Sequence, residues 1–253
     1  MTIRTGGAPN APPDKNTNIP FPLTNVPPSP IITNQLVIIG EGALFMHQRN
    51  SEETKRNILS VAEIEFAEKG LSGACVDEIA ARAKVNKALL YQYFGNKEEL
   101  YKSVLEMVYG RLTELEEHII RRSEGCMKKI RAFVRAYFHF LRENPSYVRM
   151  VMWENLNYGK FFREKGLSGV KDIMKSGLHH ILERGKERGE VAPEIRSEDI
   201  LQTLIACSFN YFSNRYTLEQ VFDRDAVSEE NMERRITSVS DMLIRYLGHG
   251  CPR

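Results

Sequence analysis

Apolar residues recur at helical spacing along most of the chain after residue 50. Ile58, Ala62 and Phe66 lie at every fourth position, which gives one apolar face to a helix that ends at Gly70. Ser51 can cap the start of this helix, and glycine suits its end because glycine tolerates a positive φ. Convincing period-two alternation, which is typical of strands, does not appear. The pattern therefore predicts an all-α protein.

Two short helices separated by a turn are expected next. The first covers residues 76–83 and follows Cys75, a poor cap because a thiol accepts hydrogen bonds weakly. Asn86 caps the second, which stops near Gly95, and Asn96 caps the helix after it. This order of elements is the helix-turn-helix layout.

Beyond Gly110 the apolar stripes continue, with breaks at Pro145 and Pro193. We interpret this half as a helical bundle. Its expected amphipathic helices cover residues 125–143, 146–155, 169–188, 197–216 and 228–247.

Residues 1–45 hold eight of the eleven prolines. Proline lacks a backbone donor and fixes φ, so we expect a disordered arm in this stretch. The arm either takes part in binding or is a non-functional extension from a start codon assigned too far upstream, since Met46 begins a conventional N-terminus. The expected domains are then residues 46–108 and residues 109–253.

Charge is concentrated in one part of the chain. The net charge is only +2, yet residues 82–97 carry four cations and no carboxylate. The distribution of charge matters more than its total for contact with phosphates. A basic helix of this kind can lie against the backbone of a duplex and read base edges in the major groove.

The second helix of the pair has one apolar face. Leu90 and Phe94 lie one turn apart, and we expect them to pack against Ile58, Phe66 and Ile79. This packing would turn the opposite face of the helix outward.

The outward face carries side chains that suit DNA. Lys87 can bind a guanine edge or a phosphate, and Gln92 can pair with an adenine edge. Tyr91 and Tyr93 can contact phosphate oxygens or thymine methyl groups, while Lys97 offers its charge and a helix N-terminus to a phosphate. The spacing also fits a three-helix core with a solvated basic face.

Residues 58–70, 76–80 and 85–100 resemble the N-terminal domain of TetR-family transcriptional regulators. The resemblance implies a homodimeric all-α repressor with an N-terminal three-helix helix-turn-helix domain and a C-terminal helical bundle for effector binding and dimerisation. It places seven residues at DNA-contact positions: Asn86, Lys87, Ala88, Tyr91, Gln92, Tyr93 and Lys97.

Two residues depart from the pattern of the family. Lys84 stands in the turn where glycine is common, and a non-glycine residue at positive φ costs about 1 kcal/mol. Cys75 replaces the usual Ser or Thr cap, which removes a hydroxyl that could face a phosphate. We therefore expect a strained or differently shaped turn.

The C-terminal half is rich in aromatic residues, which fit either an ordinary core or an effector pocket. Pockets are mostly apolar with a few polar groups. The candidate pocket residues are Tyr137, His139, Met150, Trp153, Asn157 and Asn210.

Two late helices carry apolar seams that suit a dimer contact built as a four-helix bundle. The alternative is that both seams pack within one subunit. The candidate interface residues are Leu201, Ile205, Phe212, Met232, Ile236, Val239 and Leu243.

Other chemistry finds little support in the sequence. His179 and Glu183 share a helix face, but no third ligand stands out, so we expect a solvated face and neither a metal nor a cofactor. Four scattered cysteines favour a reduced, cytoplasmic protein. No apolar run reaches the length of a membrane span, and no common catalytic motif is found.

The sequence therefore predicts a ligand-responsive transcriptional regulator rather than an enzyme. Its expected partners are a double-stranded, pseudo-palindromic operator, a second copy of the chain and an unknown small molecule that releases the DNA. The alternatives are an all-α carrier or enzyme with a vestigial helix-turn-helix, and a protein that binds any duplex through its backbone alone.

Overall fold

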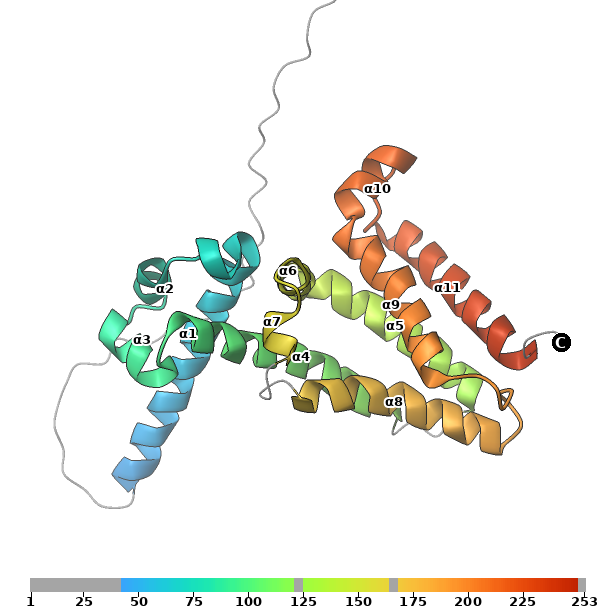
Figure 1. Cartoon of the computed structure of the whole chain (residues 1–253), viewed down its shortest axis with the longest axis horizontal. Helices are drawn as coiled ribbons and strands as arrows, with labels where there is room; N and C mark the ends of the chain where they lie inside the picture. Colours follow the sequence, from blue (N-terminus) through green and yellow to red (C-terminus); the bar gives the residue numbers. More distant parts are fainter. Residues whose placement is uncertain (1–41, 121–124, 164–167, 250–253) are drawn as a thin grey trace, which may run out of the picture. The chain divides into compact units, whose positions relative to one another are not determined.

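The computed structural model describes residues 42–120, 125–163 and 168–249. Within these ranges the chain is helical, with turns between the helices and no strand (Figure 1). The all-α prediction is therefore confirmed. Residues 1–41 of the expected arm lie outside the described residues, and its last four residues, 42–45, belong to the first helix instead of an arm.

Four helices make up the first part of the described chain. They are α1 (Gly42–Gly73), α2 (Val76–Arg82), α3 (Lys87–Phe94) and α4 (Lys97–Ile120). The expected cap at Ser51 is wrong, because α1 begins nine residues earlier and runs through it without a break.

Gly70 interrupts α1, as expected from its place after the apolar stripe. Its φ of 66° and ψ of 178° are open to glycine and to few other residues. The last turn of α1 continues beyond this kink, and the chain then enters α2.

Seven further helices follow in the described part of the chain. They are α5 (Cys126–Glu143), α6 (Pro145–Leu156), α7 (Lys160–Arg163), α8 (Ser168–Glu187), α9 (Ser197–Ser213), α10 (Arg215–Phe222) and α11 (Glu229–His249). Helix α5 is central among them, since it packs against α4, α8, α9 and α11 (Figure 1). Pro145 occupies the first turn of α6, where its missing N–H costs nothing.

The expected helix over residues 197–216 proves to be two helices. Helix α9 ends at Ser213, Asn214 takes a non-helical ψ of 15°, and α10 begins at Arg215. The carbonyl of Asn214 accepts from the N–H groups of Thr217 and Leu218, and these hydrogen bonds begin the new helix.

The core formed by α1 to α4 contains the residues that we expected to hold α3, with one exception. Ile58, Phe66, Ile79 and Leu90 are fully buried. Phe94 is only half-buried and packs at the margin of this core, so Leu90 is the main anchor of α3.

The apolar seam of α11 faces inward. Met232, Ile236, Val239 and Leu243 are buried within the subunit, and α11 packs on α5. Phe212 is buried as well and packs edge-on against Phe138. These five residues cannot be exposed interface residues, because α5 already covers the apolar stripe that the sequence displays.

Candidate nucleic-acid interface

Helix α3 is fixed at its start and along one side. The side-chain oxygen of Asn86 accepts a hydrogen bond from the N–H of Leu89 at 2.7 Å, which is the expected N-cap. Leu90 is completely buried beneath the helix. These two contacts set the rotation of α3 about its axis.

The side of α3 opposite Leu90 is open to solvent. Its exposed residues are Asn86, Lys87, Ala88, Tyr91 and Gln92. They combine one cation, two amides, a phenol and a small side chain, so the surface can donate to phosphates and to base edges.

Lys87 is held by a carboxylate of the preceding helix. Its ammonium lies 2.9 Å from Asp77 Oδ1, and both side chains are largely exposed. The hydrogen bond and the charge of Asp77 raise the pKa of Lys87. An exposed pair of this kind contributes little to stability, so Lys87 can leave Asp77 for a phosphate at low cost.

Tyr93 and Lys97 are half-buried rather than fully exposed. The ammonium of Lys55 lies 5.6 Å from the centre of the Tyr93 ring. Lys97 donates to the backbone carbonyl of Ser72 at 3.3 Å, which ties the start of α4 to the last turn of α1. Both residues border the exposed side of α3 without projecting fully from it.

The turn between α2 and α3 has the strained backbone that Lys84, in place of the usual glycine, led us to expect. Lys84 has a φ of 57°, a conformation in which a Cβ is strained. The side-chain amide of Asn57 donates to the carbonyl of Ala83 at 2.8 Å and so braces the turn from α1.

Cys75 makes no side-chain cap, as expected for a thiol. Its backbone N–H donates instead to Glu65, a carboxylate with only 1% of its side chain exposed. Lys69 and Arg82 pair with the same carboxylate at 2.7 and 3.5 Å. Burial favours the neutral acid, but the hydrogen bonds from Lys69 and from the Cys75 N–H prevail and lower the pKa of Glu65. This link between α1 and α2 was not predicted from the sequence.

Comparisons with known proteins support a DNA-binding role for the part of the chain that contains α3. Residues 58–104 match the family described as bacterial regulatory proteins, tetR family, and residues 127–243 match the tetracyclin repressor-like C-terminal domain. The HTH-type transcriptional repressor SCO4008 of Streptomyces coelicolor is 31% identical over 64% of this chain and 79% of its own length. The chain belongs to the TetR family. Its DNA-binding domain is the one that contains α3.

A second relative covers more of the chain. The HTH-type transcriptional repressor NicS of Pseudomonas putida is 27% identical over 79% of this chain and 94% of its own length. As a member of the TetR family, the chain is a DNA-binding transcriptional regulator, and its named relatives are regulators rather than enzymes.

Solved structures show the same fold. The putative regulator SCO4942 of Streptomyces coelicolor has a TM-score of 0.61 at 22% identity, covering 75% of this chain and 97% of that one. The fatty acid regulator FadR of Bacillus subtilis, solved with stearoyl-CoA, has a TM-score of 0.58 at 19% identity and covers 78% and 99% of the two chains.

The candidate pocket residues of this TetR-family regulator do not form one site. Tyr137 and Met150 are buried, and Trp153 is half-buried. Asn157 and Asn210 are exposed to solvent, so their assignment to an enclosed pocket is wrong. Asn157 follows the end of α6, and Asn210 lies on a side of α9 that other helices leave uncovered, since Tyr211 and Phe212 after it are buried.

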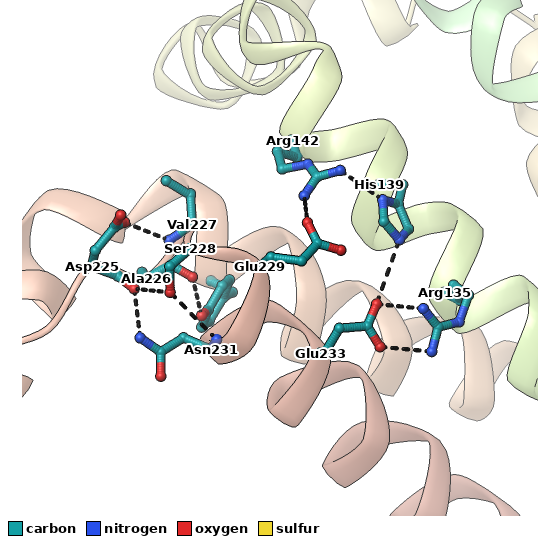
Figure 2. Close-up of polar contacts among 11 residues, drawn as sticks. Arg135, His139, Arg142, Asp225, Ala226, Val227, Ser228, Glu229, Asn231 and Glu233 are labelled. Atoms are coloured by element: carbon teal, nitrogen blue, oxygen red, sulfur yellow. Dashed lines mark hydrogen bonds and ion pairs between the residues drawn. The ribbon is translucent and has the colours of Figure 1, made fainter.

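His139 also lies away from the interior. It takes part in a polar cluster between α5 and α11, with Arg135 and Arg142 on its own helix and Glu229 and Glu233 opposite (Figure 2). One Arg142 nitrogen lies 3.0 Å from His139 Nδ1, and Arg135 donates to both oxygens of Glu233, one of them at 2.7 Å.

The residue types of this cluster could bind a metal ion, but both of its carboxylates are already paired with arginines. His139, Glu229 and Glu233 each place a ligand atom within 4.8 Å of the others. Each carboxylate is already neutralised by an arginine, and Arg142 can only donate to the ring nitrogen that faces it. We interpret the cluster as an ionic clamp between α5 and α11. The ring of His179 contacts the hydroxyl of Ser197 at 2.9 Å.

Helix α1 is joined to α4 and α6 by a half-buried ion pair. The guanidinium of Arg111 donates to both oxygens of Glu63, at 2.6 and 2.8 Å, and Ser146 donates to the same carboxylate. Nearby, Trp153 Nε1–H donates to the carbonyl of Ala67 at 3.3 Å. The helix that precedes the helix-turn-helix is therefore held by residues of α4 and α6.

Proposed function

We propose that the protein is a repressor that binds a pseudo-palindromic operator as a homodimer and is released from it by a small-molecule effector. The exposed side of α3 carries this proposal. Lys87, Tyr91 and Gln92 project from a helix that Asn86 and Leu90 hold in place. The two named relatives described above are repressors, which supports repression as the outcome.

The proposed DNA-binding domain covers residues 46–108 and the effector-binding and dimerisation domain covers residues 109–253. The two family matches, over residues 58–104 and 127–243, support this division. Binding of chromosomal DNA would place the protein in the cytoplasm. In the described part of the chain, no helix has both the length and the apolar character that a membrane span requires.

The proposed dimer uses the outward sides of α9 and α11. Leu201 and Ile205 of α9 are half-buried in the subunit, and Met242 and Tyr246 of α11 are exposed by 46 and 47%. These residues replace the α11 seam in our assignment, because the seam is core. A two-fold dimer presents its two α3 helices to half-sites about 34 Å apart, or a multiple of that distance.

The proposed effector binds among the helices of the C-terminal domain. One structural relative was solved with stearoyl-CoA and another is named a ketosteroid regulator, which supports a small organic molecule as the signal. An effector releases DNA only if it binds one conformation of the protein more tightly than the other.

Operator binding is tested by fluorescence anisotropy with a labelled duplex that covers the DNA just upstream of the gene. A scrambled duplex at the same salt concentration is the reference. We expect binding at least about a hundredfold tighter to the upstream duplex, with two protomers per site.

Lys87→Ala should weaken operator binding, whereas Lys128→Ala, which removes an exposed lysine of α5, should not. Equal and weak binding to both duplexes, unaffected by Lys87→Ala, would contradict the proposal. A carrier or enzyme with a vestigial helix-turn-helix would then be the better account.

A further inference from the structure

Glu154 is a buried carboxylate, and only one of its two oxygens accepts hydrogen bonds from the described part of the chain. It lies on α6 with 2% of its surface exposed, and its Oε1 accepts from the N–H groups of Phe161 and Phe162 at 2.8 and 3.3 Å. Its Oε2 has no hydrogen-bond partner among the described residues. A buried carboxylate oxygen without a partner is costly, so proteins keep one where a ligand or solvent completes it.

Tyr101 of α4 presents a second buried polar atom of this kind. The residue is fully buried, and its hydroxyl lacks a hydrogen-bond partner within the described ranges. Burial, and after it the charge of Glu154, raises the pKa of both Tyr101 and Tyr109. The rings of Tyr101 and Tyr109 pack against Phe161 and Phe162, whose N–H groups bind Glu154, so the phenols of α4 and the carboxylate of α6 share one interior region.

Aromatic rings surround this region. The ring of Tyr109 meets those of Tyr147 and Phe162 at centroid distances of 5.3 and 4.8 Å. The ring of Tyr101 lies 5.1 Å from that of Phe161. Aromatic faces and a carboxylate both attract a cation, and neither attracts an anion.

We infer that Glu154 and Tyr101 form the polar end of the effector site, and that the effector is a small organic cation with a protonated nitrogen. This inference rests on the proposed function, because it names the ligand of the regulator. The nitrogen donates one N–H to Glu154 Oε2 and another to the hydroxyl of Tyr101, while the organic part packs among the rings.

Other ligand classes fit this end of the site less well. A carboxylate or phosphate group would meet the charge of Glu154, and a hydrocarbon tail would leave both polar atoms without partners. A neutral alcohol could donate to Glu154, but a hydrogen bond between an ammonium and a carboxylate is roughly twice as strong.

The two polar residues are also placed to act on the DNA-binding domain. Trp153, next to Glu154 on α6, donates to the carbonyl of Ala67 in α1. Tyr101 packs edge-on against Phe66 of α1 at 5.1 Å. A ligand that moves Glu154 or Tyr101 therefore displaces side chains in direct contact with the helix that precedes the helix-turn-helix.

The test measures binding of three probes of similar shape to the full-length chain: 2-phenylethylamine, 2-phenylethanol and phenylacetate. Trp153 is the only tryptophan and neighbours Glu154, so its emission reports binding without a label. We expect the amine to bind at least about tenfold more tightly than the alcohol or the acid.

Glu154→Gln keeps the oxygen that accepts from Phe161 and Phe162, and it removes the charge. It should weaken amine binding at least about tenfold, and Tyr101→Phe at least about threefold. Glu230→Gln, at an exposed carboxylate of α11, should bind the amine as the parent chain does.

Equal binding of the three probes, or wild-type affinity in Glu154→Gln, would overturn the inference. So would the absence of amine binding together with a raised melting temperature in Glu154→Gln, since a buried water would then account for the unpaired oxygen. Operator binding measured on the same samples separates the two proposals. If a neutral or anionic compound releases the operator, this inference fails and the proposed function stands.

Discussion

Replacing Gly70 by alanine tests the contact between α1 and α6. Gly70 lies at the kink of α1 with a φ of 66° and a ψ of 178°. An added Cβ would lie 2.8 Å from Cδ2 and 2.9 Å from Cε3 of Trp153. These distances are well inside van der Waals contact, so the substitution combines backbone strain with a steric overlap.

The two effects can be given magnitudes. A non-glycine residue in this region of φ and ψ costs about 1–3 kcal/mol. Overpacking of a buried contact costs a further 1–3 kcal/mol or so. The Trp153 ring cannot move freely, because its Nε1–H is bonded to Ala67. Gly70→Ala should therefore lower the free energy of unfolding by about 2–6 kcal/mol.

Gly95→Ala is the matched control. Gly95 also has a positive φ, 76°, but an added Cβ there would meet no atom within 4 Å. Only the backbone strain of about 1–3 kcal/mol applies to it. Urea unfolding followed by circular dichroism and by Trp153 emission gives the free energy of unfolding for each variant.

A double-mutant cycle with Trp153→Ala isolates the overlap. In the Trp153→Ala background, the cost of Gly70→Ala should fall to that of backbone strain alone, because the ring is gone. The reasoning is refuted if Gly70→Ala costs no more than Gly95→Ala, or if its cost is the same with and without the ring.

Four further outcomes are expected. Lys87→Ala should weaken operator binding by about 1–3 kcal/mol if Lys87 reads a base, or lower the salt slope of binding by about one unit if it contacts phosphate; anisotropy across a salt series decides. Lys84→Gly should raise the free energy of unfolding by about 1 kcal/mol in urea, since the φ of 57° no longer strains a Cβ. Tyr101→Phe should also raise it by about 1 kcal/mol, because it removes a buried hydroxyl without a partner. Glu65 has its pKa lowered from 4.5, so its stabilisation is present above pH 4.5 and lost as pH falls below; thermal unfolding of Glu65→Gln and the parent chain should converge there.

The local features of the DNA-binding part could be predicted from the sequence. The Asn86 cap, the burial of Leu90 and the positive φ of Lys84 each depend on a few neighbouring residues. Short-range geometry decides such features, so the sequence contains enough information to place them. The start of α1 was missed because a serine that can cap also fits within a helix.

Contacts between distant helices could not be predicted in the same way. The stripe of α11 indicates a buried face, but the same spacing suits α5 of its own subunit and a partner chain. His139 was assigned to a pocket by residue type alone, whereas its direction depends on which side of α5 meets α11. The burial of Glu154 could have been predicted from its position, since it lies seven residues after Tyr147 on the buried face of α6.

The contacts on α1 also bear on how an effector signal would reach α3. Arg111 binds Glu63, Tyr101 packs on Phe66, and Trp153 lies against Gly70. A close-packed interior of this kind shifts between discrete arrangements rather than deforming smoothly. If the Trp153 contact transmits the signal, Gly70→Ala should change operator affinity per folded molecule and change effector affinity in the DNA complex by a related factor, because coupling is reciprocal. If the contact only stabilises the fold, the variant should unfold more easily while its folded fraction binds operator as the parent chain does. The two accounts therefore separate on one variant, whose strain is given by the unfolding experiments above.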